Sequence, residues 1–309
     1  MSAEAGAVLA VCEPGSDPEG TLATAGLLSL SMKAPLIAFS AIDPPSELAA
    51  LAAAVGLSEA HAVDRLVAEA RDRLEAALHA NPGPRPTVEV VTGRAFLAIV
   101  RRALVGDIAF VVKTVDEHRG GGPILASTDQ HLLRKCPATL WLRRPGDPPA
   151  PHRIAAAIDV GDPEEAALNE RIVETALRLT ALGGAPLHAV HAWQAHGEAL
   201  VRRWADGPDG AVAADRYIQS LRVRHGDALR AALGENHHHV TPELVEGAPN
   251  DAVPRVIERL GADLLVMGTV GRTGIPGVII GNTAEDILNA TSCPIVTVKP
   301  PGYVSPIAP

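Results

Sequence analysis

The sequence predicts an α/β protein made of two tandem copies of a doubly wound, five-stranded parallel-sheet domain of the Rossmann-like kind. Three observations support this. Aliphatic runs of strand length alternate with longer segments of helical periodicity. The same order of elements occurs twice, on either side of the Pro-rich stretch 144–151. Hydrophobic residues make up 47% of the 309 residues and aromatic residues only 3%, which favours helices packed on aliphatic strands.

The first half contains five short aliphatic runs that we interpret as buried strands: residues 7–12, 35–42, 87–91, 107–112 and 138–142. Helical segments are expected between them, in the Ala/Leu-rich stretch after the first strand and at residues 64–79, 96–105 and 129–135. The segment 64–79 shows the basis of these assignments, because Leu66, Ala70 and Leu74 recur at helical spacing with charged residues between them.

The second half repeats this alternation. Strands are expected at residues 153–158, 186–193, 240–245, 263–267 and 294–298, and helices at 164–182, 214–233, 251–260 and 283–290. Alternating elements of this size imply βαβ units and a parallel sheet. We therefore predict one domain over residues 1–145, a second over 152–300 and a C-terminal tail at 301–309.

The two copies align directly. Lys113-Thr114 precedes Gly268-Thr269 by 155 positions, and Ser127-Thr128 precedes Asn282-Thr283 by the same interval. The copies differ chemically at three aligned positions, where the second half has Gly268, Gly271 and Gly281 and the first half has Lys113, Asp116 and Ala126. The first copy therefore lacks the glycine motif of the second.

A glycine-punctuated loop links the strand at 263–267 to the next helix. Asn282 opens that helix and Glu285 follows three residues later, which is the spacing of a capping box. A strand, a glycine loop and a helix start together offer backbone N–H groups to an anion. The alternative is a loop that needs glycines only to turn. The first copy turns at the same place without them, which favours a ligand-binding reason.

The pattern Gly268-x2-Gly271-x9-Gly281-Asn282 resembles the motif of the universal stress protein family, in which Ser or Thr usually takes the place of Asn282. The tandem chain most resembles the E-type members of that family, through residues 131–137, 268–274 and 281–285. The resemblance implies an adenine nucleotide alpha hydrolase-like fold with a nucleotide site at the carboxyl ends of the first, second and fourth strands. It also implies pairing through the last strands, here within one chain.

The same resemblance implies roles for residues of the second half. Asp159 would face the adenine or the ribose, and Ala192 would line the adenine pocket through its backbone. Phosphate contacts would come from the glycine loop and the helix start. Apart from the resemblance, the Asp159 carboxylate is a candidate ligand for a Mg²⁺ ion beside the phosphates, because carboxylate oxygens are ligands of that ion. The expected cofactor-binding residues are Asp159, Ala192, Met267, Gly268, Gly271, Arg272, Gly281, Asn282 and Thr283.

These features predict a cytoplasmic stress-response protein whose second domain binds ATP or AMP without dedicated catalysis. One alternative is a module that binds an apolar metabolite or a protein partner. Another is a slow ATP hydrolase, which ranks lowest because no nucleophile–base arrangement, Gly-x-Ser-x-Gly or P-loop is present. The chain is expected to act as a monomer of tandem domains or as a homodimer.

Composition argues against other classes. A formal net charge of −9 disfavours a nucleic-acid-binding surface, and no apolar run has the length of a membrane span. Cys136 and Cys293 each precede a proline before a final strand, which indicates packing more than redox chemistry. The run 237–239 is interpreted as a solvated loop because no carboxylate or Cys stands at ligand spacing. His188 and His191 are expected on opposite faces of one strand.

Overall fold

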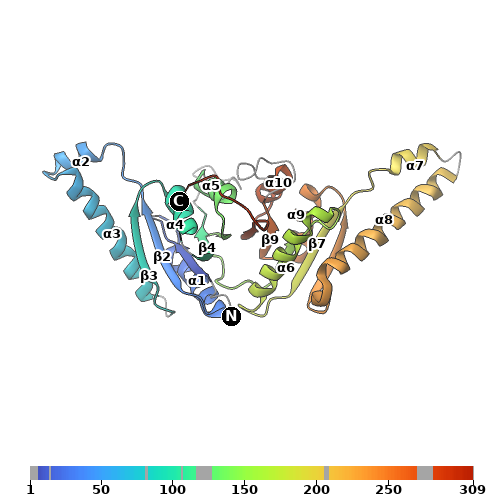
Figure 1. Ribbon diagram of the computed structural model, residues 1–309, viewed down its shortest axis with the longest axis horizontal. Coiled ribbons are helices and arrows are strands. Elements are labelled where there is room, and N and C mark those ends of the chain that lie inside the picture. Colours follow the sequence, from blue (N-terminus) through green and yellow to red (C-terminus); the bar gives the residue numbers. More distant parts are fainter. Residues whose placement is uncertain are drawn as a thin grey trace.

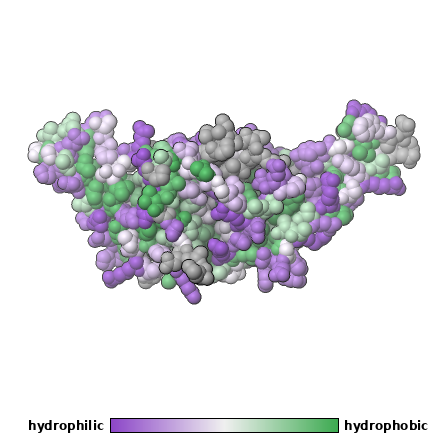
Figure 2. All heavy atoms as spheres, in the orientation of Figure 1, coloured by the Kyte–Doolittle hydropathy of each residue, from purple (hydrophilic) through white to green (hydrophobic). Residues whose placement is uncertain are grey.

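The computed structural model describes residues 6–13, 15–80, 83–105, 107–115, 127–204, 209–269 and 281–308. Figure 1 shows a central sheet with helices on both faces, and helical pairs that project at the two ends of the molecule. The side chains on the face seen in Figure 2 are mainly hydrophilic, with apolar areas between them. None of the helices in the described part of the chain has the length and apolar character needed to cross a membrane.

The first half contains five strands and five helices within the described residues. The elements in chain order are β1 (Ala7–Val11), α1 (Pro18–Met32), β2 (Leu36–Ile42), α2 (Leu48–Ala54), α3 (Glu59–Ala80), β3 (Thr87–Thr92), α4 (Ala95–Val105), β4 (Ile108–Thr114), α5 (Ser127–Lys135) and β5 (Thr139–Arg143). All five strands are parallel, in the order β3-β2-β1-β4-β5.

The second half repeats this order. Its elements are β6 (Ile154–Ala157), α6 (Ala166–Thr180), β7 (Leu187–Trp193), α7 (Glu198–Trp204), α8 (Asp209–Leu233), β8 (Val240–Glu246), α9 (Pro249–Leu260), β9 (Leu264–Gly268), α10 (Asn282–Ala290) and β10 (Ile295–Val298), with short 3₁₀ turns at Pro163–Glu165 and Gly234–His238. Its strands are also parallel to one another, in the order β10-β9-β6-β7-β8. The predicted α/β class is therefore confirmed.

The two halves share one ten-stranded sheet. They join where β5 pairs with β10 in antiparallel register, with Trp141 opposite Val296. This pairing through the last strands is the one that the family resemblance implied. It has a clear physical benefit, because each strand supplies the hydrogen-bond partners that the other would lack at an exposed sheet edge.

Apolar side chains from the two faces of the sheet form separate cores. Helices α1, α3, α6 and α8 pack on one face, and α4, α5, α9 and α10 on the other. Every residue of β2 is buried, as expected for a strand covered on both sides. Helices α2 and α7 were not predicted. Each has only seven residues, too few for the helical periodicity of the sequence to reveal them.

The C-terminal tail crosses from the second half to helix α5 of the first. Two of its side chains, together with that of Lys299 just before it, donate hydrogen bonds to the last carbonyl groups of that helix, which have no partner within the helix itself. The bonds run from Lys299 Nζ to Leu133, from Tyr303 Oη to Arg134 and from Ser305 Oγ to Lys135. A second link joins the halves, because Arg134 lies 3.4 Å from the Glu285 carboxylate on α10.

Candidate functional site

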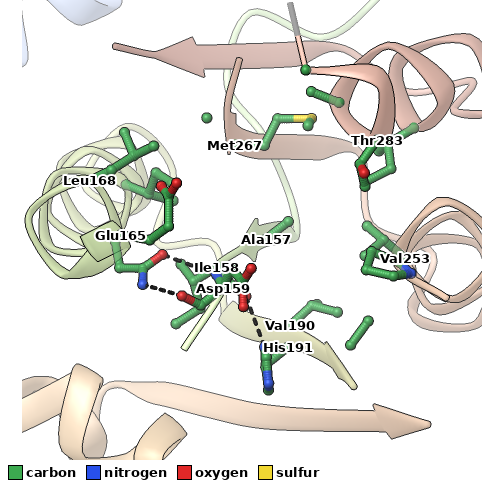
Figure 3. Close-up of a pocket in the computed structure, with 18 of the residues that line it drawn as sticks. Ala157, Ile158, Asp159, Glu165, Leu168, Val190, His191, Val253, Met267 and Thr283 are labelled. Atoms are coloured by element: carbon green, nitrogen blue, oxygen red, sulfur yellow. Dashed lines mark hydrogen bonds between the residues drawn. The ribbon is translucent and has the colours of Figure 1, made fainter. Parts of the chain in front are cut away.

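A cavity of about 500 Å³ opens at the carboxyl ends of β6, β7 and β9, beside the start of α10. Figure 3 shows side chains from these elements and from α6 and α9 around it. Seven of the nine predicted site residues line this cavity: Asp159, Ala192, Met267, Gly268, Gly281, Asn282 and Thr283. The other two, Gly271 and Arg272, lie outside the described residues. Positions far apart in the sequence thus meet at one site.

Asp159 follows β6 and is held in place by a residue that the sequence did not indicate. The side-chain amide of Asn169, on α6, donates to the Asp159 carbonyl at 2.7 Å and accepts from the Asp159 N–H at 3.0 Å. Both bonds are drawn in Figure 3. Asn169 is only 5% exposed, and its signal in the sequence is a single polar residue on the apolar face of the helix. The Asp159 carboxylate accepts a further bond from the Gly161 N–H at 2.9 Å.

His191 lines the cavity from β7 and forms a pair with His225 of α8. Its Nδ1 lies 3.2 Å from the Ile158 carbonyl, and its Nε2 lies 2.9 Å from His225 Nδ1. Since a carbonyl only accepts, Nδ1 of His191 carries the hydrogen, so in the neutral pair His225 donates to Nε2. Burial lowers the pKa of both imidazoles, which keeps the pair neutral. His188 lies on the opposite side of the strand beside Glu243, as predicted.

Gly268 has a packing requirement that is independent of any ligand. A Cβ built on Gly268 would lie 2.7 Å from Cδ2 of Leu168, a distance that real Cβ atoms do not reach. Leu168 itself is buried and lines the cavity. The absence of a side chain at 268 therefore lets α6 pack closely against the end of β9.

The start of α10 differs from the predicted capping box. The helix begins at Asn282 with Gly281 as its N-cap, and no side chain caps it. Asn282 is thus one position too far into the helix to cap it, and the Glu285 carboxylate lies near Arg134 of the other half. The first N–H groups of a helix have no partner within it. Here they belong to residues that line the cavity, 282–284.

Thr269 is a second residue that the sequence analysis missed. It is fully buried, and it lines the cavity directly after β9. Its carbonyl accepts from the Gly281 N–H at 3.1 Å, which ties the strand end to the N-cap of α10. Its hydroxyl oxygen accepts from Lys299 Nζ at 2.8 Å. It can be found only from the repeat, as the partner of Thr114.

The matching region of the first half is closed by a buried lysine. Lys113, which stands at the position of Gly268, is fully buried, with Nζ 3.2 Å from a Glu13 carboxylate oxygen and 3.0 Å from one of Asp129. Among the described residues, a cavity of about 80 Å³ lies at the end of β1, where Glu13 is one of its lining residues. The sequence difference between the copies therefore corresponds to a difference in shape.

The remaining candidates lie away from the cavity. Cys136 is fully buried, and burial raises its pKa to about 11, so its thiol stays protonated and packs as an apolar group. His237 and His238 belong to an exposed 3₁₀ turn. Within the ranges that the structure describes, no three His, Cys, Asp or Glu side chains are grouped so that they could hold a metal ion.

Fold and site together define a tandem α/β protein with an open cavity at the carboxyl ends of the strands of its second half. The sequence profile of the universal stress protein family matches residues 151–299. The chain is 30% identical over 243 residues to universal stress protein E of Escherichia coli (strain K12), an alignment that covers 75% of this chain and 74% of that protein. The chain belongs to the universal stress protein family, and its arrangement is that of the tandem E-type members.

Other similarities agree. A universal stress protein E homolog of Haemophilus influenzae is 35% identical over 199 residues, which is 62% of each chain. Among solved structures, a universal stress protein from Archaeoglobus fulgidus has a TM-score of 0.57 at 16% identity, with 96% of this chain and 98% of that chain covered. A functionally unknown protein from Pseudomonas aeruginosa PAO1 has a TM-score of 0.64 at 23% identity, with 95% and 92% covered. These two structures support the fold.

Proposed function

We propose that this stress protein binds an adenine nucleotide, ATP or AMP, in the cavity of its second half and has no dedicated catalytic machinery. The observation that carries this is the placement of the uncapped N-terminus of α10 in the same cavity as Asp159. Backbone N–H groups at a helix start bind phosphate, and a carboxylate accepts hydrogen bonds from ribose hydroxyls or from an amino group. A nucleotide carries both kinds of group.

Apolar side chains between these two ends suit a flat base. The cavity walls include Ile158 at the end of β6, Val190 of β7 and Val253 of α9. Figure 3 shows Ile158 and Val190 near Asp159, and Val253 across the cavity on the side of Thr283. Under this proposal Asp159 and Ala192 contact the adenosine part and Met267 and Gly268 flank the ribose. The phosphates lie against Gly271, Arg272, Gly281, Asn282 and Thr283. The Asp159 carboxylate is the group that would hold a Mg²⁺ ion bound together with the nucleotide.

The division of labour follows the repeat. We assign nucleotide binding to a domain of residues 152–300 and a structural role to the domain of residues 1–145. Residues 301–309 form the C-terminal tail. The buried Lys113 in the first half supports this assignment, because its side chain fills the position at which Gly268 leaves room beside the ribose, and its ammonium group is already paired with Asp129.

Titration of the purified protein with AMP, ATP and adenosine tests the proposal. We expect saturable binding at millimolar concentrations or below, and Gly281→Val is expected to abolish it by keeping phosphate away from the backbone. Ala126→Val, at the matching position of the first half, is the control and should bind as the wild type does. Binding that Gly281→Val leaves unchanged would remove the loop from the site.

A second candidate function has its own observation. Among the described lining residues the charged side chains are Asp159 and Glu165, both acidic, and most other walls are apolar. An apolar metabolite would also fit such walls. Native mass spectrometry of the protein as purified separates nucleotide binding from metabolite binding, because a co-purified nucleotide and a lipid-like ligand differ in mass.

The third candidate function is slow ATP hydrolysis. It would show as ATP turnover that the substitution Asp159→Ala removes.

A further inference from the structure

Lys299 is a buried cation next to the cavity, and it is not among the residues that the proposed function places in contact with the nucleotide. Its side chain is only 3% exposed, and Nζ donates to the Thr269 hydroxyl at 2.8 Å and to the Leu133 carbonyl. The ring of Tyr303 lies 4.9 Å from Nζ. In the part of the chain that the structure describes, no ion pair joins Lys299 to a carboxylate. A buried charge is costly unless it is both hydrogen-bonded and paired with an opposite charge, and the described residues give Lys299 only hydrogen bonds.

The first half contains the same arrangement with one addition. Arg143 lies opposite Thr114 in the sheet. In the second half Val298 lies opposite Gly268, so Lys299 and Thr269, the next residue of each segment, stand in the equivalent places. Arg143 is 1% exposed and donates to the Thr114 hydroxyl at 3.1 Å. It also donates to the Asp17 carboxylate at 2.6 Å. Each half therefore holds a cation against a threonine at the end of its fourth strand: Thr114 is the last residue of β4, and Thr269 directly follows β9. The described residues supply a carboxylate to this cation only in the first half.

We propose that Lys299, acting through Thr269, makes the second-half cavity selective for anionic ligands, and that the ligand's phosphate provides the negative charge that Asp17 provides in the first half. This rests on the proposed nucleotide function. Because Lys299 donates to the Thr269 oxygen, the hydroxyl hydrogen of Thr269 stays available to the ligand. The Thr269 carbonyl also holds the N-cap of α10. Lys299 is thus a positioning residue that adds positive charge at the phosphate end.

The surroundings of Lys299 allow its charge to be switched off by pH. Among the described residues, the titratable groups facing it are the Cys136 thiol after α5 and the Tyr303 phenol of the tail, whose pKa values burial raises to about 11 and about 12. Both stay uncharged below pH 10. Burial lowers the pKa of Lys299 to about 8. Affinity for a phosphate-bearing ligand should therefore fall as pH rises past about 8, while affinity for uncharged adenosine stays level.

Calorimetric titration with AMP, adenosine and pyrophosphate tests this on four proteins: wild type, Lys299→Met, Lys299→Arg and Lys135→Met. Lys299→Met should weaken AMP binding on the order of tenfold and leave adenosine binding unchanged, because only the phosphate feels the missing charge. Lys135→Met removes the same charge from the end of α5 without touching Thr269, and it should bind AMP as the wild type does. Lys299→Arg should retain AMP binding up to pH 9.5, since guanidinium does not lose its proton.

The outcomes separate the two proposals. Equal AMP affinity in wild type and Lys299→Met would overturn the role of Lys299 while nucleotide binding stands. If the wild type binds neither AMP nor adenosine, nucleotide binding fails. In that case, a pyrophosphate-induced rise in melting temperature in the wild type but not in Lys299→Met would still support the role of Lys299 in anion binding. If pyrophosphate raises the melting temperature of neither protein, that role is contradicted too. Should Lys299→Met not fold, the Arg variant decides, because a fall in its affinity near pH 8 contradicts the proposal.

Discussion

Lys113 Nζ lies 3.0 Å from the Asp129 carboxylate, and both side chains are fully excluded from solvent. The pair stands in the first half where the second half has Gly268 and an open cavity. The two copies of the fold thus differ at the end of the fourth strand. In the first half a buried ion pair fills the space there, and in the second half a cavity is open at the same place. In an apolar interior, the loss of one partner leaves the other charge without compensation.

Lys113→Met is therefore expected to lower the free energy of unfolding by about 3–5 kcal/mol, because the buried carboxylates of Asp129 and Glu13 would lose the positive charge that compensates them. Urea unfolding measures this loss. Arg73→Met removes a cation whose Glu69 pair is exposed, and it should cost under about 1 kcal/mol. A loss at Lys113 no larger than that at Arg73 would contradict the finding that the pair is buried.

Gly268→Ala should destabilise the protein by about 1–3 kcal/mol through the contact between the new Cβ and Leu168. Shortening the neighbour in the double variant Gly268→Ala, Leu168→Ala should make the two effects less than additive. Thermal unfolding of all three variants gives the coupling. Strict additivity would mean that Leu168 does not determine the need for glycine at 268.

Asn169→Ala should cost about 1–3 kcal/mol, since it leaves the N–H and the carbonyl of Asp159 without their partner. AMP affinity should fall as well, because Asp159 would no longer be held at the cavity. Calorimetry and urea unfolding follow the two effects separately. Gln219→Ala, an exposed site on α8, is the control for amide removal. Loss of stability without loss of affinity would show that Asn169 serves only the fold.

Lys299 should also make stability depend on pH. Its pKa is about 8 in the folded protein and 10.5 ordinarily, so between these values the unfolded chain binds more protons and stability rises with pH. The gain is on the order of 3 kcal/mol. Cys12, Cys136 and Cys293 act in the opposite direction, because burial raises their pKa above 9.0.

The difference between wild type and Lys299→Met cancels the cysteine contribution. Unfolding free energies measured from pH 7.5 to 10.5 should show the wild type gaining on the variant as pH rises. A constant difference would mean that Lys299 keeps its ordinary pKa in the folded protein.

The His191–His225 pair predicts sensitivity to acid. Both folded-state pKa values lie below 6.5, so stability is present above that pH and is lost as pH falls below it. His225→Phe keeps a ring beside Trp193 but removes one titrating group, and it should lose less stability than the wild type between pH 7.5 and 5.5. His61→Phe, at an exposed position, should follow the wild type. Melting curves at each pH provide the comparison.

Sequence by itself determined the features that repeat over short distances. Strand and helix periodicity predicted the α/β class, and the interval of 155 residues exposed the duplication. The glycine pattern located the loop, and the family resemblance that it carries assigned Asp159, Met267 and Gly281 to one site; these three residues line one cavity in the structure. The periodicity and the glycine spacing are local signals, because backbone geometry and burial act on neighbouring residues. The duplication became visible because the same local patterns occur twice.

Only the tertiary structure decided which distant side chains meet. Asn169 reaches Asp159 because α6 crosses β6 at one register, and Lys299 reaches Leu133 across 166 residues because β5 and β10 pair. The helix start at Asn282 likewise depends on how Gly281 is tied to Thr269. Such contacts follow from sheet register and helix packing, which no single stretch of sequence contains.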